Sequence, residues 1–180
     1  MLDNQGKALL VLNGLPHVGP ITLNRLLEAF DGDAVQVMQA KRNALMGVQG
    51  VGPKMAETLS SWREHFDLNR ELALLKKHRA GFVTRGDGDY PELLLQTADP
   101  PIGLYKGGQL ELAGLRCIGI VGTRKPTLYG QKMAGTIAGR LSRAGFCIVS
   151  GMARGVDAAA HLGALNAGGP SVGILGCGLD

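Results

Sequence analysis

The fold is decided by the stretch Cys147-Ile148-Val149-Ser150-Gly151-Met152-Ala153-Arg154-Gly155-Val156-Asp157, which passes from an apolar run through a glycine-rich loop into a segment of helical composition. Apolar residues over 117–121 lead to Gly122 in the same way. Those over 172–175 lead to Gly176. Short runs of β-branched residues separated by stretches of helical length are typical of parallel strands joined by crossover helices. The sequence therefore predicts an α/β fold with a parallel sheet.

A glycine-rich loop follows each predicted strand, so these loops are expected at one edge of the sheet. Ligands bind at the carboxyl edge of open α/β sheets, where helix N-termini direct free N–H groups and a partial positive charge toward them. Arg124 adds a planar guanidinium that can hold a phosphate through two hydrogen bonds, and Lys125 adds a point charge. The sequence therefore predicts a phosphate-binding site. Its expected residues lie in the first two loops: Gly122, Thr123, Arg124, Lys125, Ser150, Gly151, Arg154 and Gly155.

The charge of the chain is divided unevenly between its two parts. Residues 1–111 hold 12 Lys and Arg against 13 Asp and Glu, whereas residues 112–180 hold 7 against 2. The formal net charge of +4 at pH 7 therefore arises in the part that contains the glycine loops. A cationic surface of this kind favours a phosphate-rich partner.

Helices are expected over about 128–144 and from Val156 onward. Asp157 and His161 lie four residues apart in the second of these helices and so share one face. The pair supplies only two ligands to a metal ion, and we favour a role in structural support of the site. The sequence contains no Ser/His/Asp or Cys/His arrangement that predicts nucleophilic catalysis, no G-x-G-x-x-G and no P-loop. We therefore expect no catalytic residue, no metal and no cofactor, and these motifs give no support for a small-nucleotide enzyme.

An internal repeat organises the first third of the chain. Residues 12–20 and 45–53 align at a constant offset of 33, with Leu, Gly, Val, Gly and Pro matching. In the second copy, Gly50-Val51-Gly52 predicts a tight turn between helices, and Pro53 suits the first position of the next helix. In the first copy His17 replaces the leading glycine, so that copy is expected to be structural.

The second copy resembles the helix-hairpin-helix motif, in which the Gly-hydrophobic-Gly turn directs backbone N–H groups to a nucleic-acid phosphate. This resemblance implies a secondary DNA contact formed by Gly50, Gly52 and Lys54. The alternative is a purely structural turn between packed helices. The near-neutral charge of this part of the chain favours the structural interpretation, because unspecific nucleic-acid binding depends on cationic residues.

A boundary between two domains is expected near Gly81. Residues 1–80 are predicted to form a helical domain with two helix-hairpin-helix-like repeats, and residues 81–180 the domain with the parallel sheet. Gly and Pro are frequent after Gly81, and short strands are expected at 82–84 and 102–105. These strands extend the parallel sheet or cover its edge, and periodicity does not decide between the two.

The composition is typical of a globular protein, with 45% hydrophobic residues. The sequence lacks both an uncharged apolar stretch of about 18 residues and a signal peptide, so we expect a cytoplasmic protein without a membrane partner. Its three cysteines are an odd number without metal-ligand spacing. Cys117 and Cys147 fall in predicted strands and Cys177 in a glycine loop, and all three are expected to be buried, reduced thiols.

Several motifs together resemble the DNA-processing protein A (DprA/Smf) family. They are Gly122-Thr123-Arg124, the run from Ser150 to His161 and the run from Gly176 to Asp180, with further likeness at Tyr90-Pro91 and over 100–108. The resemblance covers about residues 82–180, and the combination is specific. It implies a Rossmann-like domain that binds single-stranded DNA, without catalysis. The family pattern continues past Gly178-Leu179-Asp180, so this domain is expected to be truncated at its C-terminus.

The resemblance also implies a role and partners. The expected role lies in DNA uptake during natural transformation, where the protein protects incoming DNA and helps to load the RecA recombinase, as a homodimer when full length. Arg124 and the loop from Ser150 to Gly155 would form the DNA pocket. Tyr129 is the nearest aromatic residue able to stack on a base, although packing is the interpretation we favour. The alternative function is that of a Rossmann-like nucleotide-binding enzyme that hydrolyses nucleoside phosphates.

Overall fold

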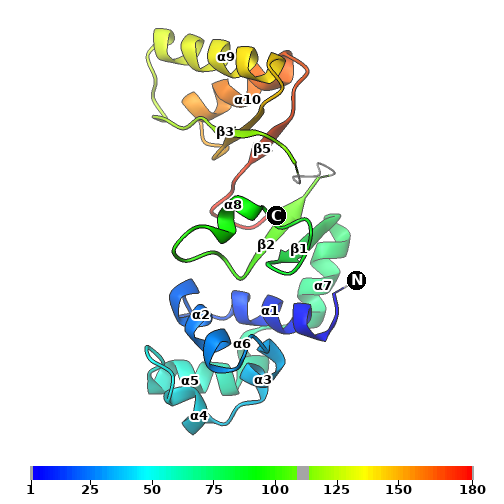
Figure 1. Cartoon of the computed structure of the whole chain (residues 1–180), viewed down its shortest axis with the longest axis vertical. Coiled ribbons are helices and arrows are strands. Elements are labelled where there is room, and N and C mark those ends of the chain that lie inside the picture. Colours follow the sequence, from blue (N-terminus) through cyan, green and yellow to red (C-terminus); the bar gives the residue numbers. More distant parts are fainter. Residues whose placement is uncertain (1, 109–113, 180) are drawn as a thin grey trace. The chain divides into compact units, whose positions relative to one another are not determined.

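The computed structural model describes residues 2–108 and 114–179, and the chain divides into two compact units, Met1–Gln109 and Leu110–Asp180 (Figure 1). The first unit consists of helices and a pair of antiparallel strands, and the second contains a parallel sheet with helices. The expected fold class, a Rossmann-like α/β sheet preceded by a small helical domain, is confirmed.

The helices of the first unit pack around one apolar core. Five leucine side chains of this core are fully buried: Leu10, Leu12, Leu26, Leu45 and Leu59. The helices that supply and surround the core are α1 (Asn4–Gly14), α2 (Pro20–Ala29), α3 (Ala34–Gln39), α4 (Arg42–Met46), α5 (Pro53–Ser60), α6 (Trp62–His65) and α7 (Leu68–Lys77). Pro53 occupies the first position of α5, as expected, because a helix needs no N–H group there.

The strands β1 (Ala80–Thr84) and β2 (Gly103–Gly107) pair antiparallel in a sheet of their own, so they do not extend the parallel sheet. The buried side chains of Phe82, in β1, and of Ile102, which directly precedes β2, belong to the core of the helical unit. For this reason the compact units divide between residues 109 and 110, and not at residue 80 as the sequence led us to expect. A cut at residue 80 would expose both side chains to water.

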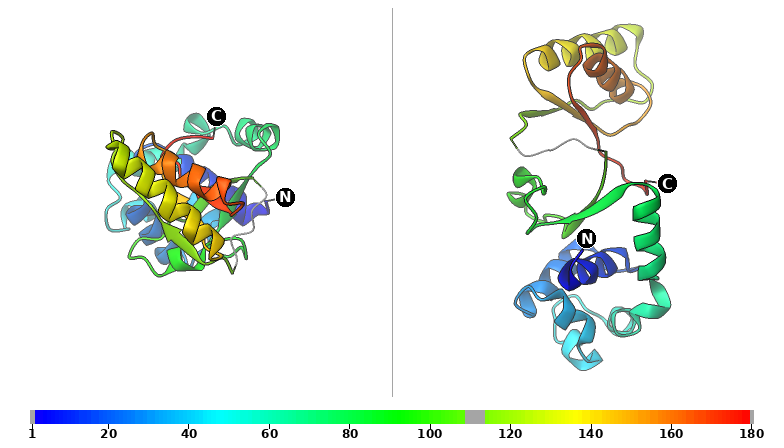
Figure 2. Two further views of the ribbon diagram at one scale, coloured as in Figure 1. Left: turned by 90° about the horizontal axis from the view of Figure 1, so that it is seen from above. Right: turned by 90° about the vertical axis from the view of Figure 1, so that its right-hand side faces the viewer.

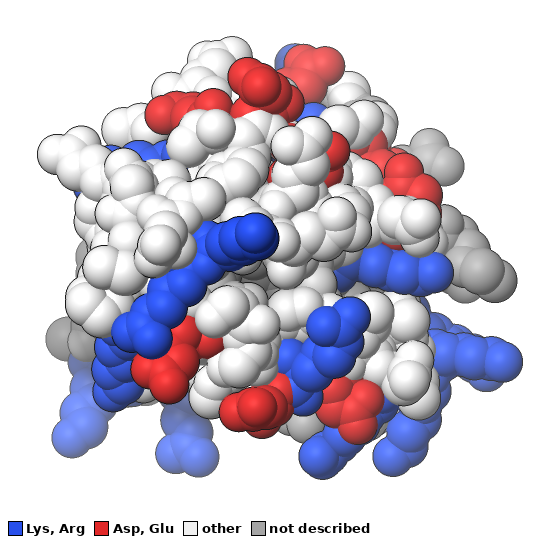
Figure 3. All heavy atoms as spheres, turned by 90° about the horizontal axis from the view of Figure 1, so that it is seen from below, with Lys and Arg blue, Asp and Glu red and all other residues white. Residues whose placement is uncertain are grey.

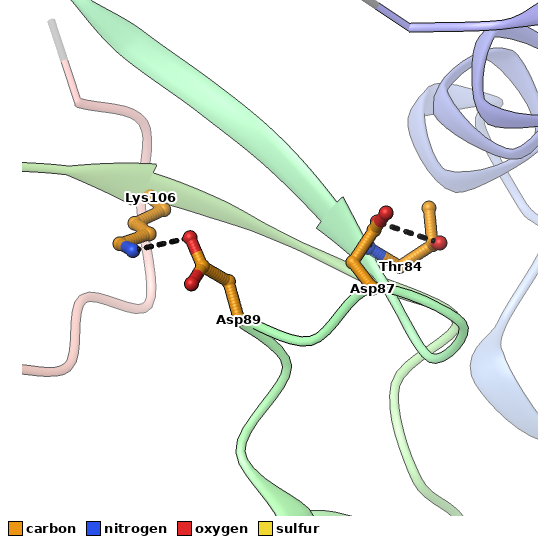
Figure 4. Close-up of polar contacts among 4 residues, drawn as sticks. All are labelled: Thr84, Asp87, Asp89 and Lys106. Atoms are coloured by element: carbon orange, nitrogen blue, oxygen red, sulfur yellow. Dashed lines mark hydrogen bonds and ion pairs between the residues drawn. The ribbon is translucent and has the colours of Figure 1, made fainter. Parts of the chain in front are cut away.

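The segment between β1 and β2 contains the short helix α8 (Glu92–Leu95) and is braced by polar contacts (Figure 4). The Asp87 carboxylate accepts hydrogen bonds from the backbone N–H and the hydroxyl of Thr84, at 2.6 and 2.8 Å. Nearby, the Lys106 ammonium forms an ion pair of 2.7 Å with Asp89. These contacts hold the turn after β1 close to both strands.

In the second unit, β3 (Cys117–Gly119), β4 (Cys147–Ser150) and β5 (Ser171–Gly173) form a parallel sheet in that order. The helices α9 (Leu128–Arg143) and α10 (Val156–Asn166) connect successive strands and lie side by side in both views of Figure 2. The two helices approach closely because their facing residues are small. A Cβ atom on Gly163 would overlap the Gly135 carbonyl oxygen.

The cysteines differ from expectation. Cys147 is fully buried, whereas Cys117 and Cys177 are exposed. β3 lies at the edge of the described sheet, so Cys117 has a neighbouring strand on one side only and is not buried between two strands. Within residues 2–108 and 114–179, no helix has the length and apolar character needed to span a bilayer.

Candidate nucleic-acid interface

The loops that follow β3, β4 and β5 leave the same edge of the parallel sheet. Beyond the end of β5, Ile174 still donates its backbone N–H to the Ser150 carbonyl at 2.8 Å. On the other side of β4, the Ser150 hydroxyl donates to the Ile120 carbonyl at 2.6 Å. The three glycine loops therefore begin at the carboxyl edge, which is the ligand-binding edge of open α/β sheets.

Asp157 joins the first loop to the second. Its carboxylate is 6% exposed and accepts hydrogen bonds from the backbone N–H groups of Gly122, at 3.2 Å, and of Ala153, at 3.4 Å. A Cβ atom on Gly151 would lie 2.9 Å from the same carboxylate. The charge of Asp157 is thus used within the protein, and the residue fixes the distance between the two loops.

Gly155 brings the two loops into direct contact. Its φ is 92°, and a Cβ atom there would overlap the Thr123 carbonyl oxygen. The same carbonyl accepts the backbone N–H of Val156 at 3.2 Å, and the Val156 side chain lies where a side chain on Gly122 would have to be. Only glycine at residues 122 and 155 leaves room for this arrangement.

Three cationic side chains are exposed to solvent at this edge. Arg124, Lys125 and Arg154 are exposed, and none of them has an ion-pair partner among the described residues. The Thr123 hydroxyl accepts the backbone N–H of Lys125 at 3.1 Å, which fixes the conformation of this loop. Ser150 is buried with its hydroxyl engaged inside the sheet, so it supports the loop and does not face a ligand.

Apolar side chains lie exposed beside these cations. Tyr129, at the start of α9, is 74% exposed, so the interpretation of this ring as a packing residue is wrong. Met152 is exposed and takes a left-handed backbone conformation with φ of 58°, which is uncommon for a residue with a side chain and concentrates at functional sites. Further exposed apolar residues at these loops are Val121, Leu128, Ile174 and Leu175. Sequence periodicity did not separate them from core residues.

His161 has a different role from Asp157, although the two are one helical turn apart. Its Nδ1 atom lies 2.7 Å from the Ser171 hydroxyl, which donates to the Ile148 carbonyl at 3.1 Å. His161 therefore ties α10 to β5, while Asp157 ties the loops together. No group of side chains with the composition of a metal site occurs in the part of the chain that the structure describes.

The two repeats of the first unit form turns of the same kind. Gly50 has a φ of 93°, and His17, its counterpart, takes a φ of 64°. Arg25, from α2 of the first repeat, lies over the second turn, where its Nη1 atom would be 3.2 Å from a Cβ atom on Gly50 and donates to the Gln49 carbonyl at 3.4 Å. Sequence analysis did not identify Arg25, because it is 25 residues from Gly50 and reaches the turn only through folding.

Charge around the second turn is modest. Lys54 is exposed in the first turn of α5, and Gly50 and Gly52 are exposed as well. On the face of the molecule drawn in Figure 3, Lys and Arg are interspersed with Asp and Glu. A surface on which both charges alternate provides isolated contacts to phosphates. It does not form a continuous cationic surface.

The family model and the curated proteins similar to this chain point to the same family. Residues 81–180 match the family model described as DNA recombination-mediator protein A. Protein Smf of Synechocystis sp. is 37% identical over 167 residues, which cover 91% of this chain and 42% of that protein. DNA processing protein DprA of Bacillus subtilis is 35% identical over 114 residues, or 63% of this chain and 38% of that protein.

Among solved structures, the chain is similar to the X-ray structure of DNA processing protein A from Streptococcus pneumoniae. The TM-score is 0.71 at 26% sequence identity, and the match covers all of this chain and 60% of that one. The chain thus spans about two fifths of the length of the curated relatives named above. The family match begins at residue 81, the boundary expected from the sequence, although β1 and β2 pack with the helical unit.

Proposed function

The chain belongs to the DNA recombination-mediator protein A (DprA/Smf) family, and on this basis we propose that it binds single-stranded DNA at the carboxyl edge of β3, β4 and β5. The observation that carries the proposal is the combination of exposed cations with exposed apolar side chains at one edge of the sheet. Single-strand binding uses these two features together, cations for the backbone and flat apolar side chains for the bases.

Each group has a separate task in this proposal. The Arg124 guanidinium holds one phosphate through two hydrogen bonds, while Lys125 and Arg154 add charge along the backbone. Backbone N–H groups of the two loops, other than those of Gly122 and Ala153, which are bound to Asp157, complete the phosphate contact. Asp157 does not repel the phosphate strongly, because its buried carboxylate is bound to two loop N–H groups.

The apolar residues favour single strands over duplexes. In a duplex the base faces are stacked on one another, whereas in a single strand they are accessible to Tyr129 and its apolar neighbours. Anisotropy titration of a labelled single strand, with duplex and mononucleotide competitors, tests this directly. We expect single strands to compete and duplex to compete weakly. Strong competition by a mononucleotide accompanied by phosphate release would instead indicate the nucleotide-hydrolysing alternative.

Replacement of Arg124 by Ala is expected to weaken single-strand binding about tenfold or more, because a hydrogen bond to a charged group contributes about 1.5–3 kcal/mol. The slope of log K against log salt is expected to flatten by about 0.7, the value for one phosphate contact on a single strand. The matched control is Arg143→Ala, an exposed arginine in the last turn of α9, which is expected to leave affinity and slope unchanged. Wild-type binding by the Arg124 variant would exclude this edge as the DNA site.

Replacement of Tyr129 by Ala is expected to cost about 1–3 kcal/mol of binding free energy, since one base loses its stacking partner. Tyr129→Phe keeps the ring and is expected to bind normally. The salt slope is expected to stay unchanged in both variants, since no phosphate contact is lost. Equal loss in the Ala and Phe variants would assign the effect to the hydroxyl and contradict stacking.

We further propose a secondary DNA contact at the turn of Gly50 and Gly52, with Lys54 and Arg25 beside it. Lys54→Ala is expected to weaken binding only about twofold to fivefold, the range for an exposed charge contact of about 0.5–1 kcal/mol. Lys76→Ala, on the exposed surface of α7, is the control. If neither variant changes the affinity or the salt slope, the turn is structural only.

In the whole protein, we place this binding in DNA uptake and recombination in the cytoplasm. The proposed partners are single-stranded DNA and the RecA recombinase, and the full-length protein is proposed to act as a homodimer without a cofactor or a catalytic step. The family description and the names of the relatives support a role in DNA processing. A pull-down of RecA by the full-length protein, with and without single-stranded DNA, tests the partnership.

A further inference from the structure

Two thiols meet at the end of the parallel sheet opposite the candidate DNA interface. Cys117 is the first residue of β3 and Cys147 the first of β4, and the two are register partners in the parallel pair. Register partners on neighbouring strands point to the same face of the sheet. The next pair, Ile118 and Ile148, therefore faces the other side, where Ile148 packs on the alanines of α9 and α10.

We propose that Cys117 and Cys147 are a modification site at which a hydroperoxide converts two thiols into a reversible disulfide. Neighbouring strands lie about 4.8 Å apart, and a disulfide joins residues whose Cα atoms are about 4.4–6.8 Å apart. The spacing of the two strands thus lies within the Cα range that a disulfide spans. The inference is independent of the proposed DNA binding.

The two thiols are suited to different steps. Cys117 is exposed and accessible to peroxide, whereas Cys147 is 0% exposed and is not directly accessible. Burial first, and the Cys117 side chain second, raise the pKa of the Cys147 thiol to about 11. Cys147 is therefore protonated at neutral pH and a poor first nucleophile, because the thiolate is the reactive form.

The peroxide is the only oxidant that this reaction requires. The Cys117 thiolate attacks one peroxide oxygen, the O–O bond breaks, and the leaving hydroxide takes a proton, which gives a sulfenic acid and water. The Cys147 sulfur then attacks the Cys117 sulfur, the S–O bond breaks, and a second water leaves with the Cys147 proton. Two thiols are oxidised and one peroxide is reduced to two waters.

The geometry also makes the bridge easy to reduce. Side chains of a parallel register pair leave their strands in nearly the same direction, so their Cβ atoms stay about as far apart as the strands, beyond the usual disulfide value of about 3.8 Å. Strained or exposed disulfides are the labile ones. A mild thiol is therefore expected to restore both cysteines.

The test uses the full chain and hydrogen peroxide, followed by alkylation under denaturing conditions and peptide mass spectrometry. We expect a loss of two hydrogens per chain, a peptide link between Cys117 and Cys147, a monomer on a non-reducing gel, and recovery with glutathione. Cys177→Ser is expected to behave as the wild type. In Cys147→Ala, the Cys117 sulfenic acid is expected to be trapped by dimedone without a link, and circular dichroism checks that this variant is folded.

Three results would overturn the proposal. They are oxidation of Cys117 to sulfinic acid without any link to Cys147, a link that joins Cys177 to either of the other cysteines, and a link found only between chains. Single-strand affinity is a useful second readout. Because the bridge lies at the amino edge of the sheet, oxidation of the pair is expected to leave DNA binding unchanged.

Discussion

Replacement of Gly155 by Ala is expected to destabilise the second unit by about 4 kcal/mol, a large share of the roughly 5–15 kcal/mol by which folded domains are stable. Gly155 has φ of 92° and ψ of −122°, a conformation that residues with a side chain essentially do not adopt, at a cost of about 1–3 kcal/mol. The added methyl group would also overlap the Thr123 carbonyl and lie 2.9 Å from the Arg124 carbonyl carbon. Overpacking of this kind costs about 1–3 kcal/mol more.

Two measurements separate this effect from a general loss of structure. Hydrogen exchange of β4 and α10 is expected to accelerate strongly, while the unfolding transition seen by the fluorescence of Trp62, the single tryptophan, reports on the first unit and is expected to change little. Gly168→Ala is the matched control. Gly168 has a φ of 74° but open space around it. The Gly168→Ala variant is therefore expected to lose only about 1–2 kcal/mol of stability, the cost of the backbone strain alone. Equal effects at the two glycines would contradict the contact between the loops.

Replacement of Asp157 by Ala is expected to lower stability by about 3 kcal/mol and to abolish most single-strand binding. The variant loses two hydrogen bonds to a charged acceptor and leaves the N–H groups of Gly122 and Ala153 without this partner in a partly buried place. The two loops are then no longer held at a fixed distance, so Arg124 and Arg154 cannot contact neighbouring phosphates together. Urea unfolding and anisotropy titration measure the two effects.

Asp157→Asn distinguishes positioning from charge. The amide keeps one acceptor but presents an NH₂ group to one of the two backbone N–H donors, so an intermediate loss of stability is expected. Because the carboxylate does not touch the DNA in our proposal, the salt slope of the Asn variant is expected to equal that of the wild type. Tighter DNA binding after removal of the negative charge would show that Asp157 opposes the phosphate and does not support the site.

The sequence determined those features that depend on residues near one another in the chain. The helix expected over about 128–144 is α9, because a stripe of apolar residues and the Thr127 cap specify it locally. The helix expected from Val156 is α10, whose alanine-rich sequence favours a helix. The three short apolar runs gave the parallel strands in the expected order along the chain. Their glycine loops at one edge followed from the geometry of parallel strands.

The tertiary structure alone decided how these elements combine. Phe82 and Ile102 joined the helical core because an apolar side chain packs against whichever face is available, and no local pattern encodes that choice. Asp157 and His161 took separate roles because their partners lie on loops and strands far along the chain. The exposure of Tyr129 was likewise set by the absence of a packing partner in the described structure, which only three-dimensional contacts reveal. The sequence shows which residues are apolar and how they are spaced. The fold determines which of them remain exposed at the candidate site.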